Sequence, residues 1–361
     1  MEKKKLLTHG GDWAGYQAEY GCQPLDFSAN ISPLGLPEGI QKAITEAIPM
    51  ADRYPDPLCR ELTAAIAEKE NVSETCCLCG NGAADLIFRV ASAVKPKKAL
   101  LTVPCFAEYE QALDTVGCQT EHYILQAEWD FRLDTGFLEY ITQDTDMVFL
   151  CEPNNPTGVT TDRKLLLEIL EKCREVGAIL VLDECFNDFL DEPQEYTLKM
   201  ELAEYPNLLI LKAFTKMYAM AGVRLGYCLC ADEKLLEDMR QAGQPWAVSS
   251  LAQAAGLAAL KEDAYVERVR NLIQKERFWL KEELRGFGLR VIDGEANYIL
   301  FQSKKELVQP MREKGILLRS CGNYKGLDDT WMRIAVRTHA ENERLILAME
   351  EVLACKKQKP L

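Results

Sequence analysis

The lysine with the clearest chemical potential in this sequence is Lys216, which follows Thr215 in a segment that is otherwise apolar. An amine in an apolar pocket loses hydration, so its pKa falls and it becomes a nucleophile toward aldehydes. Arg224 lies eight residues further on, among small residues, and a hydroxyl group and a guanidinium group are suited to hold a phosphate. The segment therefore suggests imine chemistry with an aldehyde that carries a phosphate, such as pyridoxal phosphate (PLP).

Further candidate ligands follow predicted strands in the same part of the chain. Gly82 and Ala83 lie between a strand and a helix, where backbone N–H groups and the helix dipole favour an anion. Phe106 could stack on a planar ring, and Asn155, in a proline-rich loop, offers an amide to a ligand hydroxyl or phenolate. Asp183 ends an apolar strand, and a carboxylate there would favour a protonated pyridine. Each feature taken alone also fits a structural role, as a turn, a core aromatic residue or a solvated strand end.

Short apolar runs alternate with amphipathic stretches from about residue 74 to residue 230. Strands that alternate with helices predict a mostly parallel sheet with helices on both faces. Ligands bind such sheets at the carboxyl ends of the strands, and the candidate residues follow predicted strands. The predicted strands are 76–79, 99–103, 147–151, 178–182, 208–211 and 226–230, and the predicted helices are 83–94, 106–116 and 163–176.

The pattern changes near residue 248. Two long helices are predicted over 251–260 and 265–284, and short strands follow them, which is typical of a smaller α+β domain. The predicted short strands are 289–291, 298–301, 316–318 and 332–336, and a closing helix is predicted at 342–353.

The start of the chain carries proline and glycine signals, with little regular structure expected before residues 37–48. We therefore expect three parts. Residues 1–45 form an N-terminal segment that packs on the small domain and the active site. Residues 46–247 form a large cofactor-binding domain, and residues 248–361 form a small C-terminal domain.

The composition excludes several classes of protein. The chain has 361 residues, 48% of them hydrophobic and 27% charged, which predicts a globular protein large enough for two domains. Its formal net charge of −14 disfavours non-specific binding to nucleic acid or to an anionic membrane, since both need a basic face. The sequence has no run of 18 apolar residues that would span a membrane.

Fourteen cysteines are scattered along the chain, often in apolar segments. Small secreted scaffolds cluster their cysteines, and the charged first residues do not resemble a secretory signal. We therefore expect reduced thiols in a cytoplasmic protein. Cys76 and Cys79 have the spacing of metal ligands, but no second pair occurs, so no metal site is predicted.

Together these segments resemble the fold-type I PLP-dependent enzymes of the aspartate aminotransferase superfamily. The Asn-Asn-Pro-Thr-Gly loop at 154–158, the strand end at Asp183 and the segment from Thr215 to Arg224 occur in that superfamily's order. The resemblance covers essentially the whole chain. It implies an α/β fold, the PLP-dependent transferase fold type I, with a mostly parallel central sheet in a large domain and a smaller α+β domain.

The resemblance also implies PLP as the cofactor and a role for each candidate residue. Lys216 would bind the cofactor aldehyde covalently, and Asp183 would pair with the pyridine nitrogen, which makes these two the expected catalytic residues. Asn155 would bond the ring oxygen, Phe106 would stack on the ring, and Arg337 would take the substrate carboxylate. The expected ligands of the cofactor phosphate are Gly82, Ala83, Thr215 and Arg224, with Tyr54 reaching the cofactor phosphate of a partner subunit in a homodimer.

Within the superfamily the sequence resembles two families most, the threonine-phosphate decarboxylases of cobalamin synthesis and the histidinol-phosphate aminotransferases. The strings at 26–35, 106–109 and 318–327 favour the decarboxylases. Phe186 stands where these aminotransferases usually have a tyrosine, although it could be a packing variant.

Both candidate substrates carry a phosphate, so a second anion site is expected. We place it at Arg319, with His9 and Asn30 as lesser partners. The expected activity is PLP-dependent decarboxylation of L-threonine O-3-phosphate to (R)-1-amino-2-propanol O-2-phosphate, for the cobalamin nucleotide loop. The alternatives are a histidinol-phosphate aminotransferase and a non-catalytic protein of the same fold.

Overall fold

A seven-stranded sheet forms the centre of the molecule, whose computed structural model describes residues 9–354. The strand order is β2-β8-β7-β6-β5-β3-β4, and β8 alone runs antiparallel to its neighbours. The mostly parallel α/β sheet expected from the sequence is therefore confirmed. Its strands are β2 Cys77–Gly80, β3 Lys98–Val103, β4 Gln119–Ile124, β5 Met147–Cys151, β6 Ile179–Asp183, β7 Leu208–Ala213 and β8 Gly226–Cys230.

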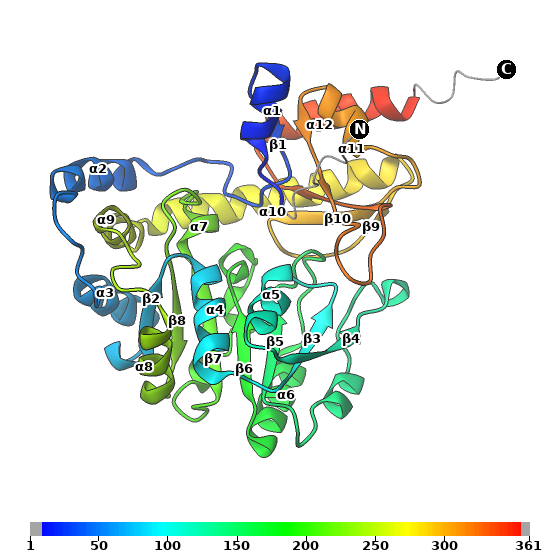
Figure 1. Cartoon of the computed structure of the whole chain (residues 1–361). Coiled ribbons are helices and arrows are strands. Elements are labelled where there is room, and N and C mark those ends of the chain that lie inside the picture. Colours follow the sequence, from blue (N-terminus) through cyan, green and yellow to red (C-terminus); the bar gives the residue numbers. More distant parts are fainter. Residues whose placement is uncertain (1–8, 355–361) are drawn as a thin grey trace.

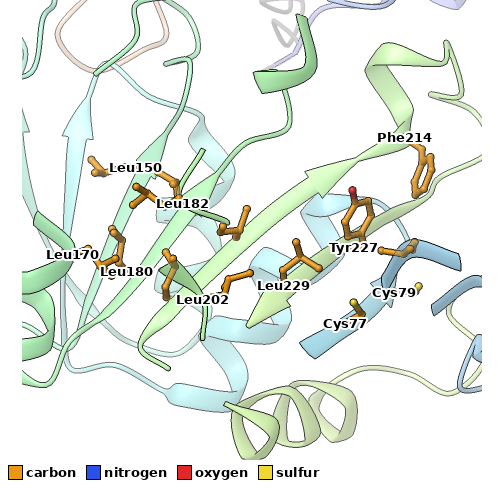
Figure 2. Packing of buried hydrophobic residues seen from close by; sticks show 14 of the residues in the cluster. Cys77, Cys79, Leu150, Leu170, Leu180, Leu182, Leu202, Phe214, Tyr227 and Leu229 are labelled. Carbon is orange, nitrogen blue, oxygen red and sulfur yellow. The ribbon is translucent and has the colours of Figure 1, made fainter. Parts of the chain in front are cut away.

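Helices cover both faces of this sheet, since alternate residues of each strand point to opposite faces and both sets are apolar. On one face, α4, α5 and α8 pack on the strands through residues such as Leu86 and Met239 (Figure 1). On the other face, α3, α6 and α9 contribute to a second cluster, and Figure 2 shows Leu170 of α6 beside Leu180 of β6 in it. The helices are α3 Arg60–Glu70, α4 Ala83–Val94, α5 Ala107–Thr115, α6 Arg163–Val176, α8 Glu233–Ala242 and α9 Ser250–Ala259, and the short α7, Phe214–Met217, follows β7.

A smaller α+β unit follows, as expected. It contains a four-stranded antiparallel sheet in the order β12-β13-β10-β9. The long helix α10 lies between this unit and the large sheet (Figure 1) and supplies Val269 and Ile273 to the smaller unit's core. Its elements are α10 Asp263–Gly286, β9 Arg290–Val291, β10 Tyr298–Gln302, α11 Val308–Glu313, β11 Ile316–Leu317, β12 Arg319–Ser320, β13 Trp331–Ala335 and α12 His339–Ala354.

The N-terminal segment is joined to this smaller unit by backbone pairing. Strand β1 (Leu25–Asp26) pairs in parallel with β11. The expectation of little regular structure before residue 37 is wrong for one stretch, because α1 (Trp13–Tyr20) forms there. Local capping explains it: the Asp12 side chain accepts a hydrogen bond from the Gly15 N–H, and Gly21, at φ +73°, ends the helix. Residues 1–8 of the predicted segment lie outside the described residues.

The regular structure expected at 37–48 is a helix, α2 (Glu38–Ala47), which packs against α9. The side chains of Ala252, Ala255 and Ala259 on α9 belong to the core of the large unit. Judged by which core its side chains enter, the smaller unit thus begins at α10. The predicted domain boundary at residue 248 stays a prediction. Among residues 9–354, no helix is both long and apolar enough to cross a membrane.

Candidate active site

The strand register brings the predicted cofactor ligands to one edge of the large sheet. Strands β5, β6 and β7 end there at Cys151, Asp183 and Ala213, and Asp183 is paired with Cys151. Strand β8 runs in the opposite direction, so it begins at this edge, where Gly226 pairs with both Ala213 and Gly80. The loops after β2, β5, β6 and β7 therefore meet, at the edge that faces α10 in Figure 1.

Lys216 lies on α7, directly after β7. Burial lowers the pKa of its amine, and the guanidinium groups of Arg224 and Arg333 lower it further. Cys185 and Asp183 act in the opposite direction, but the net shift is downward. The neutral amine is the nucleophilic form, so this environment prepares Lys216 to attack an aldehyde.

An apolar wall and the N-terminal segment border this lysine. The centre of the Phe186 ring is 5.8 Å from Lys216 Nζ, and this ring packs edge-on against Tyr298, with 5.0 Å between the centroids. The Tyr298 hydroxyl donates to the Asn154 carbonyl oxygen over 2.9 Å. On the other side the Ser32 N–H donates to the backbone oxygen of Lys216 over 3.0 Å. The segment before α2 thus contacts the backbone of the candidate catalytic residue.

A buried hydroxyl group holds Asp183 in place. The Tyr109 hydroxyl donates to Asp183 Oδ2 over 2.6 Å, and the Cys185 N–H donates to Oδ1 over 3.0 Å. Burial and the neighbouring carboxylate raise the pKa of Tyr109 well above its usual value, so the phenol remains a donor. Phe106 lies edge-on to Tyr109, with 5.6 Å between the ring centroids, which brings the predicted stacking residue and the predicted carboxylate into one cluster.

Asn155 is buried in the loop after β5, and its side-chain oxygen accepts a hydrogen bond from Arg333. Arg333 also donates to the Ser28 carbonyl oxygen over 3.2 Å. No carboxylate within residues 9–354 forms an ion pair with this buried guanidinium, and its Nε has no hydrogen-bond partner there. A buried cation without an anionic partner is costly, which is typical of a site that binds an anionic ligand.

Arg337, the predicted carboxylate ligand, has other partners. Its guanidinium donates to the Asp26 carbonyl oxygen over 3.1 Å and forms an ion pair of 2.7 Å with Glu341. No hydrogen bond or ion pair joins it to Lys216 or Asn155 in the described structure. The structure therefore brings Arg333, rather than Arg337, to the cluster around the lysine.

The loop after β2 forms a cradle that fits a phosphate. Gly82 has φ +81°, and a side-chain Cβ there would lie 2.5 Å from an Arg224 guanidinium nitrogen. Helix α4 starts at Ala83, and no side chain caps its first N–H groups. Thr215 is buried next to Lys216 on α7. Free N–H groups, a helix dipole and a guanidinium group in one place suit an anion, so these residues fit the phosphate of PLP.

A cavity of about 120 Å³ contains two of the residues predicted for a second anion site. Its lining includes His9, Phe106 and Arg319, which come from three distant parts of the chain. His9 Nε2 lies 2.7 Å from Glu108 Oε1. Asn30 is buried, and its side-chain oxygen has no hydrogen-bond partner among the described residues.

Arg319 and Arg333 are direct neighbours across two antiparallel strands, because β12 pairs residue 319 with residue 333 of β13. Arg319 donates to the side-chain oxygen of Asn323 over 2.8 Å. Like charges opposite each other destabilise a sheet, so this pair calls for a functional explanation.

Tyr54 is separate from the rest of the candidate site. Its side chain is 80% exposed and stacks on Trp246, with 4.5 Å between the ring centroids. No contact joins it to Gly82 or Arg224 within residues 9–354. Its predicted role concerns a partner subunit, and it stays a prediction.

The sequence reasoning missed two residues of this site. Tyr109 stands three residues after Phe106, a spacing that places both on one side of the first turn of α5. Arg333 stands on a strand whose other residues are apolar, and an unpaired charge in a buried strand is the signal that could have identified it.

Comparisons with known proteins agree with this geometry. The family model for class I and II aminotransferases matches residues 23–349. The threonine-phosphate decarboxylase of Salmonella typhimurium is 38% identical over 360 residues, which cover 96% of each chain. The crystal structure of L-threonine-O-3-phosphate decarboxylase from Porphyromonas gingivalis is similar with a TM-score of 0.82 at 26% identity, over 91% of this chain and 99% of that one. The histidinol-phosphate aminotransferase from Clostridium acetobutylicum gives a TM-score of 0.86 at 29% identity, over the same shares.

Proposed function

Because the chain belongs to the family of class I and II aminotransferases, we propose that it is a PLP-dependent threonine-phosphate decarboxylase. It converts L-threonine O-3-phosphate to (R)-1-amino-2-propanol O-2-phosphate and CO₂, for the nucleotide loop of cobalamin. The 38% identity to a threonine-phosphate decarboxylase over nearly the whole chain supports this assignment. A relative named as an adenosylcobalamin biosynthesis bifunctional protein, 31% identical over 96% of this chain, supports the pathway.

The observation that carries the proposal is the pair of arginines at 319 and 333. Threonine phosphate has two anionic groups on a short skeleton, a carboxylate on Cα and a phosphate on Cβ. Arg333, beside Asn155 and near Lys216, is placed to bind the carboxylate. Arg319, which lines the cavity with His9, is placed to bind the phosphate. Each anionic group of the substrate would thus meet one arginine, and the two contacts would fix the orientation of the substrate.

The side chains divide the work at Cα. Lys216 would hold the cofactor covalently, and its amine, whose pKa is lowered, would return a proton to Cα. Asp183, held by Tyr109, would keep the pyridine nitrogen protonated, and Asn155 would bond the ring oxygen. Bound in this way, PLP would accept the electron pair of the bond that breaks at Cα. The two arginines set which bond that is, because they decide how the substrate is rotated.

The leaving carboxylate raises a specific difficulty. An arginine that bound it at full strength would stabilise the ground state and oppose the loss of CO₂. Arg333 already donates to Asn155 and to the Ser28 carbonyl oxygen, so part of its hydrogen-bonding capacity is used by the protein. We infer that it orients the carboxylate without binding it at full strength.

We also propose a cytoplasmic homodimer in which Tyr54 binds the cofactor phosphate of the partner subunit. Tyr54 and Trp246 form an exposed aromatic stack, and Met50 and Leu58 are exposed nearby in sequence. Exposed apolar groups of this kind favour a protein interface. Sedimentation of the purified protein tests the oligomer, and a monomer that retains full activity would contradict it.

The decisive experiment is product analysis with the PLP-loaded protein. It is incubated with threonine phosphate or serine phosphate, and CO₂ and the amine phosphate are measured. In parallel, histidinol phosphate is offered with 2-oxoglutarate. We expect CO₂ from threonine phosphate without an oxo acid. Glutamate formation from histidinol phosphate, with no CO₂ from threonine phosphate, would instead establish the aminotransferase alternative that the structural similarity to histidinol-phosphate aminotransferases keeps open.

A further inference from the structure

A cavity of about 610 Å³ lies at the start of α3, lined by residues outside the candidate active site. Two thiols, Cys59 and Cys79, are in its lining, together with the guanidinium-bearing residues Arg89 and Arg240. The side chains of Cys59 and Cys79 interact with each other and belong to one buried cluster, so the two thiols are neighbours. Both cysteines are free, and nothing in the proposed reaction uses them.

Cys59 has the surroundings of a reactive thiol. It is the N-cap residue of the 11-residue helix α3, where the helix dipole favours a negative charge. The hydrogen bond from Cys79 lowers the pKa of Cys59, and Arg89 and Arg240 lower it further, while burial and Asp56 oppose them. In every other described cysteine with a shifted pKa, the pKa is raised. Burial is the main cause, except for Cys79, where the interaction with Cys59 is the largest cause.

Cys79 has the position of a second thiol that can react with the first. It lies on β2, where Figure 2 shows it with Cys77. The Thr63 hydroxyl, one turn into α3, lies 3.8 Å from its sulfur. No group of three histidine, cysteine or acidic side chains that would hold a metal ion occurs in residues 9–354, so the pair is not part of such a centre.

We propose that Cys59 and Cys79 form a peroxide-reactive pair that closes to a reversible disulfide. The Cys59 thiolate attacks one oxygen of a hydroperoxide, the O–O bond breaks, and Cys59 becomes a sulfenic acid while hydroxide or alkoxide leaves. The Cys79 thiol then attacks the Cys59 sulfur, and water leaves as the S–S bond forms. The peroxide is reduced by two electrons and the two thiols are oxidised by two.

The position of the pair links this chemistry to the proposed function. Cys79 stands three residues before Gly82 of the phosphate cradle, and Cys59 stands five residues after Tyr54. A disulfide would therefore join the segment that reaches the partner subunit to the strand that carries the cradle. This consequence for activity rests on the proposed function, whereas the thiol chemistry does not.

The test is mass spectrometry of the full-length protein after brief treatment with hydrogen peroxide and alkylation of the remaining thiols. We expect one cross-linked peptide that joins Cys59 to Cys79 and disappears on treatment with dithiothreitol. In Cys79→Ser we expect dimedone to trap a sulfenic acid at Cys59. Without peroxide, iodoacetamide should modify Cys59 at least tenfold faster than Cys77 at neutral pH.

Cys77→Ser, on the same strand, is the matched control and should form the cross-link as the wild type does. Cys59→Ser should abolish both the cross-link and the dimedone adduct, and it should fold because serine differs from cysteine only in having oxygen in place of sulfur. Absence of the adduct in Cys79→Ser, or a cross-link that uses Cys77 in the wild type, would overturn the proposal. Decarboxylase assays on the same samples separate the two claims, since the disulfide is detected whether or not threonine phosphate is the substrate.

Discussion

The two sides of the candidate active site are built in different ways. The cofactor side comes from loops at the edge of one sheet, and the strand register alone brings Lys216, Asp183 and Gly82 together. The substrate side is assembled from the N-terminal segment and the smaller unit, as in the contact of Arg333 with Ser28, 305 residues away in sequence. The difference suggests a division of labour: the sheet edge supplies chemistry common to the family, and the long-range contacts select the substrate.

The largest effect is expected from the cofactor side. Lys216→Ala removes both the covalent attachment and the proton donor, so turnover should fall by about 10²–10⁴-fold or more. The attachment is measured from the visible absorbance of the PLP-loaded protein and from the fraction of this absorbance that dialysis removes. Lys261→Ala, at an exposed lysine, is the control and should behave as the wild type. Stable, borohydride-reducible attachment of PLP to Lys216→Ala would contradict the assignment.

The next prediction distinguishes the two candidate carboxylate ligands. Arg333→Ala should lower kcat/KM for threonine phosphate roughly 30- to 150-fold. This corresponds to a loss of about 2–3 kcal/mol of transition-state stabilisation, as expected for a lost charge-assisted hydrogen bond. Arg337→Ala should lower it less than tenfold and should mainly reduce thermal stability, because Arg337 is paired with Glu341. The reverse order of the two effects would return the carboxylate site to Arg337.

A somewhat smaller effect is expected at the phosphate site. Arg319→Ala should raise KM for threonine phosphate roughly tenfold or more, since one charge-assisted contact is lost. Any decarboxylation of threonine, which has no phosphate, should be unchanged by this substitution. The preference between the two substrates is thus the measurement that tests the role. Arg344→Ala, at an exposed arginine, is the control, and an equal loss with both substrates would indicate a merely structural role.

The smallest effect concerns the stability of the cofactor side. Burial raises the pKa of Glu152, in the loop after β5, to about 8, although hydrogen bonds from Thr161 lower it in part. Because the folded state binds this proton more tightly than the unfolded state, the stabilisation is complete below about pH 4.5 and is lost as the pH rises through about 8.

Denaturant unfolding at pH 5.5 and pH 8.5 measures this effect. The wild type should lose at least about 1 kcal/mol more free energy of unfolding between these values than Glu152→Gln does, since one pKa unit corresponds to about 1.4 kcal/mol. Glu70, whose pKa is lowered to about 2, does not titrate in this window, whereas Glu184, whose pKa burial raises to about 7, titrates there in both proteins. Parallel pH profiles of the two proteins would show that Glu152 is ionised in the folded state.

The sequence predicted the cofactor side well for a physical reason. Strands that are buried on both faces are continuous apolar runs, and β5 and β8 therefore have the predicted bounds. The amphipathic helices α4 and α6 have the predicted bounds as well. Strand β4 was not predicted, because it lies at the edge of the sheet and four of its residues in succession, Gln119-Thr120-Glu121-His122, are polar. Helices α1, α3 and α8 were also missed, since their mixed polar sequences form helices through local caps and tertiary packing.

The substrate side could be predicted only in part from the sequence. His9, Asn30 and Arg319 were proposed from a resemblance, and only the fold shows that His9 and Arg319 share a cavity. The choice between Arg333 and Arg337 depends on which guanidinium group is hydrogen-bonded to Asn155. The spacing of the two arginines along the sequence gives no information on that contact.

The hydrogen bonds of the segment around residue 27 have a consequence for synthesis in the cell. Phe27 accepts a bond from the Ala335 N–H, and Leu25 pairs with Ile316. A ribosome therefore makes the first wall of the pocket some 300 residues before the strands that hold it. This segment can pair with its partner strands only after nearly all of the chain has emerged, when the large sheet can already have folded. A truncated product should thus be able to form the large sheet with its cofactor side and yet lack the part of the pocket that selects the substrate.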